Sequence, residues 1–204
     1  MMRDNPMTTE EMLRLKGVHL APYMQLATVL IGKNRYGGGN MFRHQLDTMA
    51  VLIDYGYINS ILLKAAIVHD ILEDVPDFNH NTLLQIDYES HSVYELVKEV
   101  TRAPNETKSE FLVRILESGS REAKVLKVAD RISNMVSLGF VNSMDFVKRY
   151  TEETERHVFS IAELVDKSML EELQSLVKSR RQYVSDFEKV KSKEAAYTDS
   201  TDFL

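Results

Sequence analysis

The chain has 204 residues, a formal net charge of −6 and no cysteine. This length is typical of one domain, and such a chain buries roughly 70% of the surface that its unfolded form exposes, so no disulfide or structural metal is needed for folding. The lack of cysteine excludes thiol catalysis, thiolate zinc sites and iron–sulfur clusters, and the acidic charge argues against nucleic acid as a partner. No secretory signal or membrane-spanning apolar run is visible, so we expect a cytoplasmic protein with no membrane partner.

The predicted elements are all helices, because apolar residues recur at helical spacing and no long run alternates with period two. A capped helix begins at Thr8 or Thr9 and ends at Gly17. The helices predicted after it cover 22–31, 42–55, 59–74, 79–85, 93–100, 109–116, 121–138, 142–165 and 170–190, with a loop over 32–39. We therefore expect one all-α domain over 1–190, a bundle of roughly nine to eleven helices, and a polar, disordered tail over 191–204.

The most informative segment is His69-Asp70 followed by Glu73-Asp74, within the run AAIVHDILED. Residues three and four positions apart share one face of a helix, so these four groups converge on one face of the predicted helix 59–74. The rest of the run is almost wholly apolar, and buried ionisable groups are costly unless they pair or bind a cation. Metal binding is therefore the first hypothesis.

Two distant segments add further candidate ligands, His44 in NMFRHQL and Asp130 in KVADRISNM. Imidazoles and carboxylates without a thiolate suit manganese, iron or zinc, and the residue types alone do not choose among these metals. Taken singly, His44 could be an ordinary interior histidine, and Asp130 could be an ion-pair partner of Lys127 or Arg131. The joint pattern favours a metal site.

The order His44, His69-Asp70, Asp130 resembles that of HD-domain phosphohydrolases. HDILED, KVADRISNM and the segment 35–44 resemble in particular the hydrolase domain of the RelA/SpoT family, over about residues 20–165. That family removes the 3′-pyrophosphate from the guanosine alarmones ppGpp and pppGpp. Only one amphipathic stretch and the polar tail follow, so the chain resembles a small stand-alone alarmone hydrolase.

The resemblance implies an HD-type helical bundle, Mn²⁺ as the cofactor and a guanosine nucleotide as the small-molecule partner; it does not indicate the oligomeric state. It implies His44, His69, Asp70 and Asp130 as the metal ligands. Glu73 and Asp74 would form the catalytic pair that accepts and donates protons. Their alternative role is a solvated helix end, although the helix dipole opposes negative charge there.

The resemblance also implies five substrate-binding residues. Arg35 corresponds to an arginine that stacks on guanine, Lys127 would face the phosphates, and Asn134 shares a helix face with Asp130. Tyr150 and Thr154 fall in a segment, RYTEET, that resembles a ligand-proximal element of the family. The alternatives are a surface arginine in a glycine-rich loop for Arg35 and an ion pair with the nearby acids for Lys127.

The chain departs from the family at several positions that bear on nucleotide specificity. Gln45 stands where the family commonly has proline, Ser133 where it has histidine, and the loop after Asp74 differs. None of these changes removes a proposed metal ligand. Two other functions stay open: another HD-type nucleotide phosphohydrolase, and a non-catalytic alarmone sensor, against which the complete Glu73-Asp74 pair argues.

Overall fold

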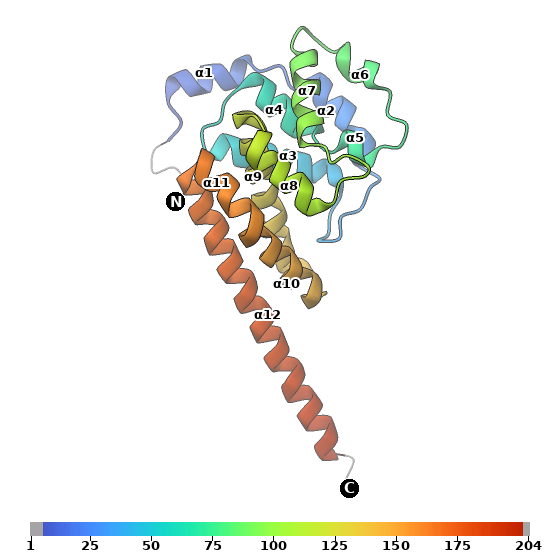
Figure 1. The fold of residues 1–204 in the computed structure, drawn as a ribbon, viewed down its shortest axis with the longest axis vertical. Helices are drawn as coiled ribbons and strands as arrows, with labels where there is room; N and C mark the ends of the chain where they lie inside the picture. Colours follow the sequence, from blue (N-terminus) through green and yellow to red (C-terminus); the bar gives the residue numbers. More distant parts are fainter. Residues whose placement is uncertain (1–5, 202–204) are drawn as a thin grey trace.

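The computed structural model describes the backbone of residues 6–201 and the side chains of residues 6–192. In this part of the chain the only strand-like feature is an isolated bridge between Asn34 and Asn40, so the all-α prediction is confirmed (Figure 1). From the N-terminus, the elements are α1 (Thr9–Gly17), α2 (Ala21–Ala27), η1 (Thr28–Leu30), α3 (Met41–Asp54), α4 (Ser60–Val68), α5 (Ile71–Asp74), α6 (His80–Leu84), α7 (Ser90–Val100), α8 (Lys108–Ser118), α9 (Arg121–Ser137), η2 (Leu138–Phe140), α10 (Met144–Glu153), η3 (Thr154–Val158), α11 (Phe159–Val165) and α12 (Lys167–Thr201).

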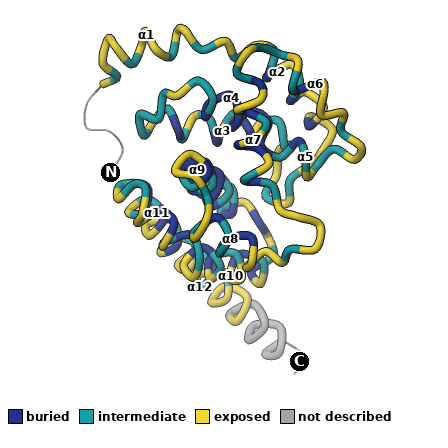
Figure 2. The backbone as a smooth tube through the Cα atoms, turned by 45° about the horizontal axis from the view of Figure 1, so that its top comes forward, coloured by how far each residue is buried: buried dark blue, intermediate teal, exposed yellow. Residues whose placement is uncertain are grey.

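Helix α9 lies at the centre of the bundle and packs against α3, α7, α11 and α12. Ten of its 17 residues are buried, which is more than one face of a surface helix can supply. Helix α4 is also buried, over all of 62–68, whereas α1 has no buried residue (Figure 2). The candidate ligands of α3, α4 and α9 therefore lie on the elements that form the core.

The predicted single helix over 59–74 is wrong, because α4 ends at Val68 and α5 begins at Ile71. The His69 side chain bonds the Ala66 carbonyl through Nδ1 at 2.8 Å, and the Asp70 backbone N–H is directed to Gln45 Oε1 at 3.5 Å. A side chain that enters the backbone hydrogen-bond ladder is a known cause of a helix break. The His69-Asp70 pair consequently sits at a junction between two helices rather than on one continuous helical face.

Helix α12 is longer than predicted and projects from the bundle (Figure 1). It continues through Thr201, so the backbone over 191–201 is helical where we expected a disordered tail; residues 202–204 lie outside the described residues. Lys, Glu and Ala are good helix formers, and no Gly or Pro interrupts this segment. The high polar content of residues 191–204 was therefore a poor guide to where α12 ends.

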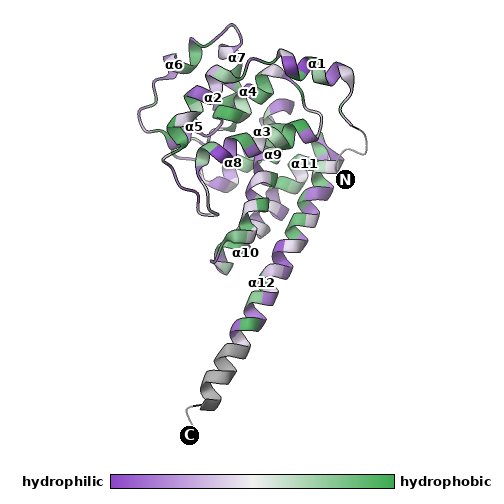
Figure 3. Ribbon diagram, turned by 180° about the vertical axis from the view of Figure 1, so that it is seen from behind, coloured by the Kyte–Doolittle hydropathy of each residue, from purple (hydrophilic) through white to green (hydrophobic). Residues whose placement is uncertain are grey.

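The predicted helix over 142–165 consists of α10, the π-helical segment η3 and α11 in direct succession. Hydrophobic residues gather in the inner helices, whereas hydrophilic residues predominate in α1 and alternate with hydrophobic ones along the coloured part of α12 (Figure 3). None of the helices in the described part of the chain combines the length and apolar character needed to cross a membrane.

One buried charge cluster connects α2, α4 and the segment before α7. Lys64 on α4 has only 2% of its side chain exposed, and its ammonium group pairs with Asp87 at 2.7 Å and with Glu89 at 2.5 Å. Tyr23 on α2 donates to Asp87 at 2.9 Å. Burial acts to raise the pKa of Asp87 and of Glu89, but the hydrogen bonds and charge of Lys64, together with further hydrogen bonds to each carboxylate, outweigh burial and lower both pKa values. The pairing of Lys64 therefore stabilises the packing of α4 against the start of α7.

We expect Lys64→Met to lower the free energy of unfolding at pH 7 by about 3 kcal/mol, because two mostly buried carboxylates lose their cation. The ordinary pKa values are 3.8 for Asp87 and 4.5 for Glu89, and the folded values lie below them. The contribution of Lys64 is therefore full above these values and is lost as the pH falls through the folded values. Urea unfolding of the two proteins between pH 7 and about pH 3 should show the difference shrinking with acidification; a difference that is constant with pH would contradict this account.

Candidate functional site

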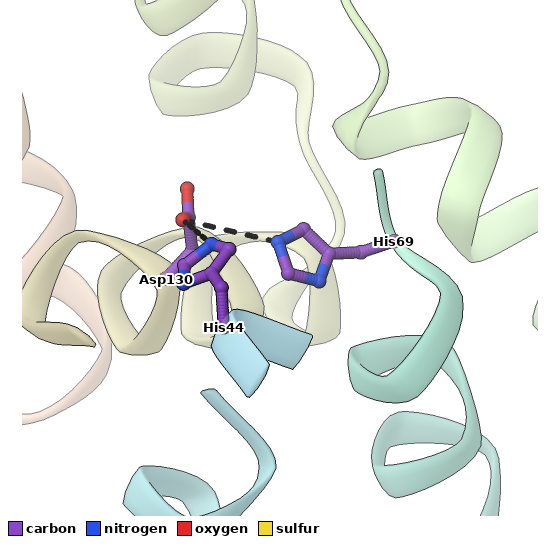
Figure 4. A group of neighbouring side chains, drawn as sticks. All are labelled: His44, His69 and Asp130. Carbon is purple, nitrogen blue, oxygen red and sulfur yellow. Dashed lines mark hydrogen bonds and ion pairs between the residues drawn. The ribbon is translucent and has the colours of Figure 1, made fainter. Parts of the chain in front are cut away.

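Three helices bring His44, His69 and Asp130 together in the core (Figure 4). His44 lies on α3, His69 directly follows α4, and Asp130 lies near the middle of α9. One ligand atom from each residue lies within 4.8 Å of the other two, and all three residues are buried. Three of the four predicted metal ligands thus form one compact group from segments up to 86 positions apart.

His69 has the geometry of a histidine ligand. Its Nδ1 faces the Ala66 carbonyl oxygen, which only accepts, so Nδ1 carries a proton. Its Nε2 is buried without a hydrogen-bond partner among the described residues and lies 3.2 Å from Asp70 Oδ2 and 3.8 Å from Asp130 Oδ1. Burial alone would lower the pKa of His69, but the charges of Asp70 and Asp130 outweigh it and raise the pKa to about 9. A cation would replace the proton on Nε2.

Hydrogen bonds to neighbouring polar groups also fix the positions of the His44 and Asp130 side chains. His44 Nδ1 lies 3.0 Å from Ser133 Oγ, and Nε2 lies 3.0 Å from Asp130 Oδ1. Burial acts to raise the pKa of Asp130, but the adjacent Lys127 charge and the two imidazoles hold it well below its usual range. Asp130 is therefore an anionic carboxylate with imidazole nitrogens directed at one of its oxygens.

Asp70, the fourth predicted ligand, lies beside the compact group. Its Oδ2 is 3.2 Å from His69 Nε2 and 3.6 Å from His44 Nε2, and it accepts a hydrogen bond from Gln45 at 2.8 Å. Two imidazoles and two carboxylates with an orphaned, buried imidazole nitrogen fit a divalent cation such as Mn²⁺, Fe²⁺ or Zn²⁺. The donor set thus agrees with the predicted metal chemistry and does not select one metal.

His44, Asp70 and Asp130 line a cavity of about 370 Å³, whereas His69 is not among its lining residues. The cavity combines both signs of charge: its acidic lining residues are Asp70, Glu73, Asp74 and Asp130, and its basic lining residues are Lys33, Arg35, Lys108, Lys127 and Arg131. A volume in this range is typical of small-molecule sites. The carboxylates and imidazole of the lining can hold a cation, and its lysine and arginine side chains can hold an anionic group.

Glu73 and Asp74, the predicted catalytic pair, both line this cavity. Glu73 accepts a hydrogen bond from the backbone N–H of Arg102 at 2.6 Å, and Asp74 is ion-paired with Lys33. They stand on the short helix α5, one turn after the His69-Asp70 junction. The predicted proximity to the ligands is therefore achieved through two helices with a break between them.

Arg35, Lys127 and Asn134, predicted to bind substrate, also line the cavity. Arg35 donates to the side-chain oxygen of Asn134 at 2.8 Å and to Ser137 at 3.2 Å. Asn134 in turn donates from Nδ2 to Asp130 Oδ1 at 2.5 Å, while Lys127 pairs with Asp130 Oδ2 at 2.7 Å. A hydrogen-bonded chain thus joins the arginine of the loop to the buried carboxylate.

Tyr150 lines the cavity, but Thr154 does not. The Thr154 hydroxyl is fully buried; it accepts from Arg131 at 3.1 Å and donates to the Tyr150 carbonyl at 2.7 Å. Its hydroxyl thus holds Arg131, and the contact of Thr154 with a substrate stays a prediction. The Arg131 guanidinium lies 4.2 Å from the centre of the Tyr150 ring and pairs with Glu153 at 2.7 Å.

Several polar residues at or beside the site were not predicted to take part in it. Lys33, Lys108 and Arg131 line the cavity, while Gln45 and Ser133 contact Asp70 and His44. Ser133 lies three positions after Asp130 and Gln45 follows His44 directly, so helical spacing and adjacency could have identified both. Lys108 begins a distant helix, and no local signal marks it.

Comparisons with known proteins support the fold. No protein-family model matches this chain, and no curated protein matches it by sequence. A solved structure described as a metazoan ortholog of SpoT that hydrolyzes ppGpp and plays a role in starvation responses is similar, with a TM-score of 0.65 and 20% sequence identity. The likeness covers 86% of this chain and 98% of that chain. The chain therefore shares the fold of that structure, and its core holds the group of His44, His69 and Asp130.

Proposed function

We propose that this protein is a metal-dependent hydrolase that removes the 3′-pyrophosphate from ppGpp or pppGpp, giving GDP or GTP and pyrophosphate. The observation that carries the proposal is the cavity itself, in which His44 and Asp130 of the buried His/His/Asp cluster line the same space as several lysine and arginine side chains. The solved structure of similar fold, described as hydrolysing ppGpp, supports the same substrate class. The motifs HDILED and KVADRISNM support it independently of the fold.

His44, His69, Asp70 and Asp130 would hold the cation, and we propose Mn²⁺ because of the family resemblance. A divalent cation supplies polarisation of a phosphoryl oxygen and activation of water near neutral pH. The chain's own residues must orient the phosphates and move the protons.

Glu73 and Asp74 are the groups proposed to move protons. In the hydrolysis, the bond between the 3′-oxygen and its phosphorus breaks, and the oxygen of water joins the departing pyrophosphate. One carboxylate accepts a proton from the attacking water, and the 3′-oxygen takes up a proton as it leaves. The Arg102 backbone N–H and the Lys33 ammonium fix the orientation of the two acids.

The basic lining residues are proposed to bind the remainder of the nucleotide. Lys108, Lys127 and Arg131 supply charge to the phosphates, and Arg35 offers a planar guanidinium for stacking on the purine. Asn134 and Tyr150 lie beside Arg35 and Arg131 and supply polar and aromatic contacts. This division places the base near the glycine-rich loop and the pyrophosphate near the metal ligands.

We expect the purified protein to release pyrophosphate from ppGpp in the presence of Mn²⁺, and Asp70→Ala to lose both bound metal and this activity. Removing one of four ligands leaves the cation incompletely coordinated, while the helical fold is retained. The measurements are product analysis by anion-exchange chromatography, elemental analysis for manganese and circular dichroism. A full metal complement in folded Asp70→Ala would contradict the ligand assignment.

The same assay separates the other functions. Release of orthophosphate, or turnover of a different nucleotide in place of ppGpp, would indicate another HD-type phosphohydrolase. Binding of ppGpp by the Mn²⁺-loaded protein without turnover would indicate a sensor. Restoration of the chelated protein by zinc alone would overturn the choice of manganese.

We expect Glu73→Gln and Asp74→Asn to lower kcat by about a hundred- to ten-thousand-fold while Mn²⁺ and nucleotide binding persist. Both changes keep the size of the side chain and remove the basic carboxylate. Arg35→Ala is the contrasting variant: base stacking acts in the ground and transition states alike, so its main effect should be a higher KM. Steady-state kinetics of the three variants makes this comparison, and wild-type kcat in both carboxylate variants would show that α5 is merely a solvated helix end.

A further inference from the structure

Gln45 is a buried polar residue next to a candidate metal ligand. It follows His44 on α3, has no exposed surface, and lies at a position where the resembled family commonly has proline. A buried amide is costly unless it is hydrogen-bonded. Its partners therefore indicate what it does in this chain.

Both ends of the Gln45 amide are directed at Asp70. Nε2 donates to Asp70 Oδ2 at 2.8 Å, and Oε1 lies 3.5 Å from the Asp70 backbone nitrogen, which donates. The short bond carries the interaction, and the longer contact fixes which way the amide points, since a carboxylate only accepts and a backbone N–H only donates. One side chain on α3 thus restrains both the backbone and the carboxylate of Asp70.

Asp70 needs such restraint more than His44 and Asp130 do. Asp130 projects from the middle of α9 and His44 from α3, whereas Asp70 occupies the junction between α4 and α5. Its side chain is 22% exposed, against 2% for His44 and 8% for Asp130. The oxygen that accepts from Gln45 is also the one that lies 3.2 Å from His69 Nε2.

We propose that Gln45 is a positioning residue that holds Asp70 Oδ2 toward the two imidazoles and so strengthens the binding of a divalent cation. This inference rests on the proposed function, because Asp70 is a ligand only if the metal site exists. A neutral amide restrains Asp70 without placing a further charge beside it. A carboxylic acid at the same position would place a third acid against Asp70.

The test is direct titration of the metal-free full-length protein with MnCl₂, with free Mn²⁺ followed by its electron paramagnetic resonance signal. Gln45→Met keeps the volume of the side chain and removes the donor, and we expect the Mn²⁺ affinity to fall about ten- to a hundredfold. Gln45→Glu should weaken binding as well, because it replaces the donor by an acceptor. Thr48→Val is the matched control: Thr48 is fully buried on the same helix, and its hydroxyl has no partner among the described residues.

A double-mutant cycle separates positioning from packing. If Gln45 acts through Asp70, Gln45→Met should have little further effect on Mn²⁺ affinity in an Asp70→Asn background, where the charged ligand is absent. Equal Mn²⁺ affinity of the wild type, Gln45→Met and Gln45→Glu would overturn the proposal, as would an equal loss in Thr48→Val. Failure of the wild type to bind Mn²⁺ would overturn the metal site itself, which is a different result from a site that binds equally well without the amide.

Discussion

The desolvation of Asp130 is the constraint on which the arrangement of the core helices depends. A fully buried carboxylate is stable only when hydrogen bonds and opposite charge replace the water that it loses. For Asp130 these partners come from its own helix, in Lys127 and Asn134, and from α3, in His44. Because His69 also faces the same carboxylate, α3, α4 and α9 must meet at one point, and that point is the candidate metal site.

Two other buried charges, those of Lys64 and Arg131, also need partners that replace lost water, but their partners stabilise the fold and do not form a candidate metal site. Lys64 has two carboxylate partners and Arg131 is paired with Glu153 and Thr154, so their ion pairs join helices and stabilise the fold. The cluster around Asp130 differs because it gathers two imidazoles and a carboxylate that can ligate a cation, and His69 Nε2 has no hydrogen-bond partner in the described part of the chain. Arg131 Nε also has no such partner there, but a guanidinium only donates and cannot ligate a cation. Buried polar atoms are rarely left in this state without a reason. That contrast separates a site built to receive a cation from charge clusters that merely hold helices together.

The sequence predicted the helical class, most helix positions and the grouping of His44, His69 and Asp130, because helical periodicity and the motif spacing are local signals. It did not predict the break after Val68, which depends on the His69 side chain and on Gln45 from another helix. Nor did it predict that the buried Thr154 hydroxyl bonds Arg131. Lys108 could not be found, because its approach to the cavity depends on how α8 packs against the rest of the bundle. In each of these cases the deciding contact is between residues distant in the sequence, or between a side chain and the backbone.

The charged groups of the cavity are paired with one another, and this has a consequence for the ligand. Arg35 bonds Asn134, Lys33 pairs with Asp74, and both Lys108 and Arg131 reach Glu153. An anionic nucleotide would exchange these internal partners for its phosphates, so each new bond replaces an existing one and the net gain per contact is small. A gain in affinity therefore depends on the doubly charged phosphate groups of the ligand and on their contact with the bound cation. A ligand with a single carboxylate has less charge to offer to these lysines and arginines and to the cation. If the proposed function holds, competition with these ion pairs would favour polyphosphorylated ligands, and the two carboxylates of α5 line the same cavity as three of the candidate metal ligands.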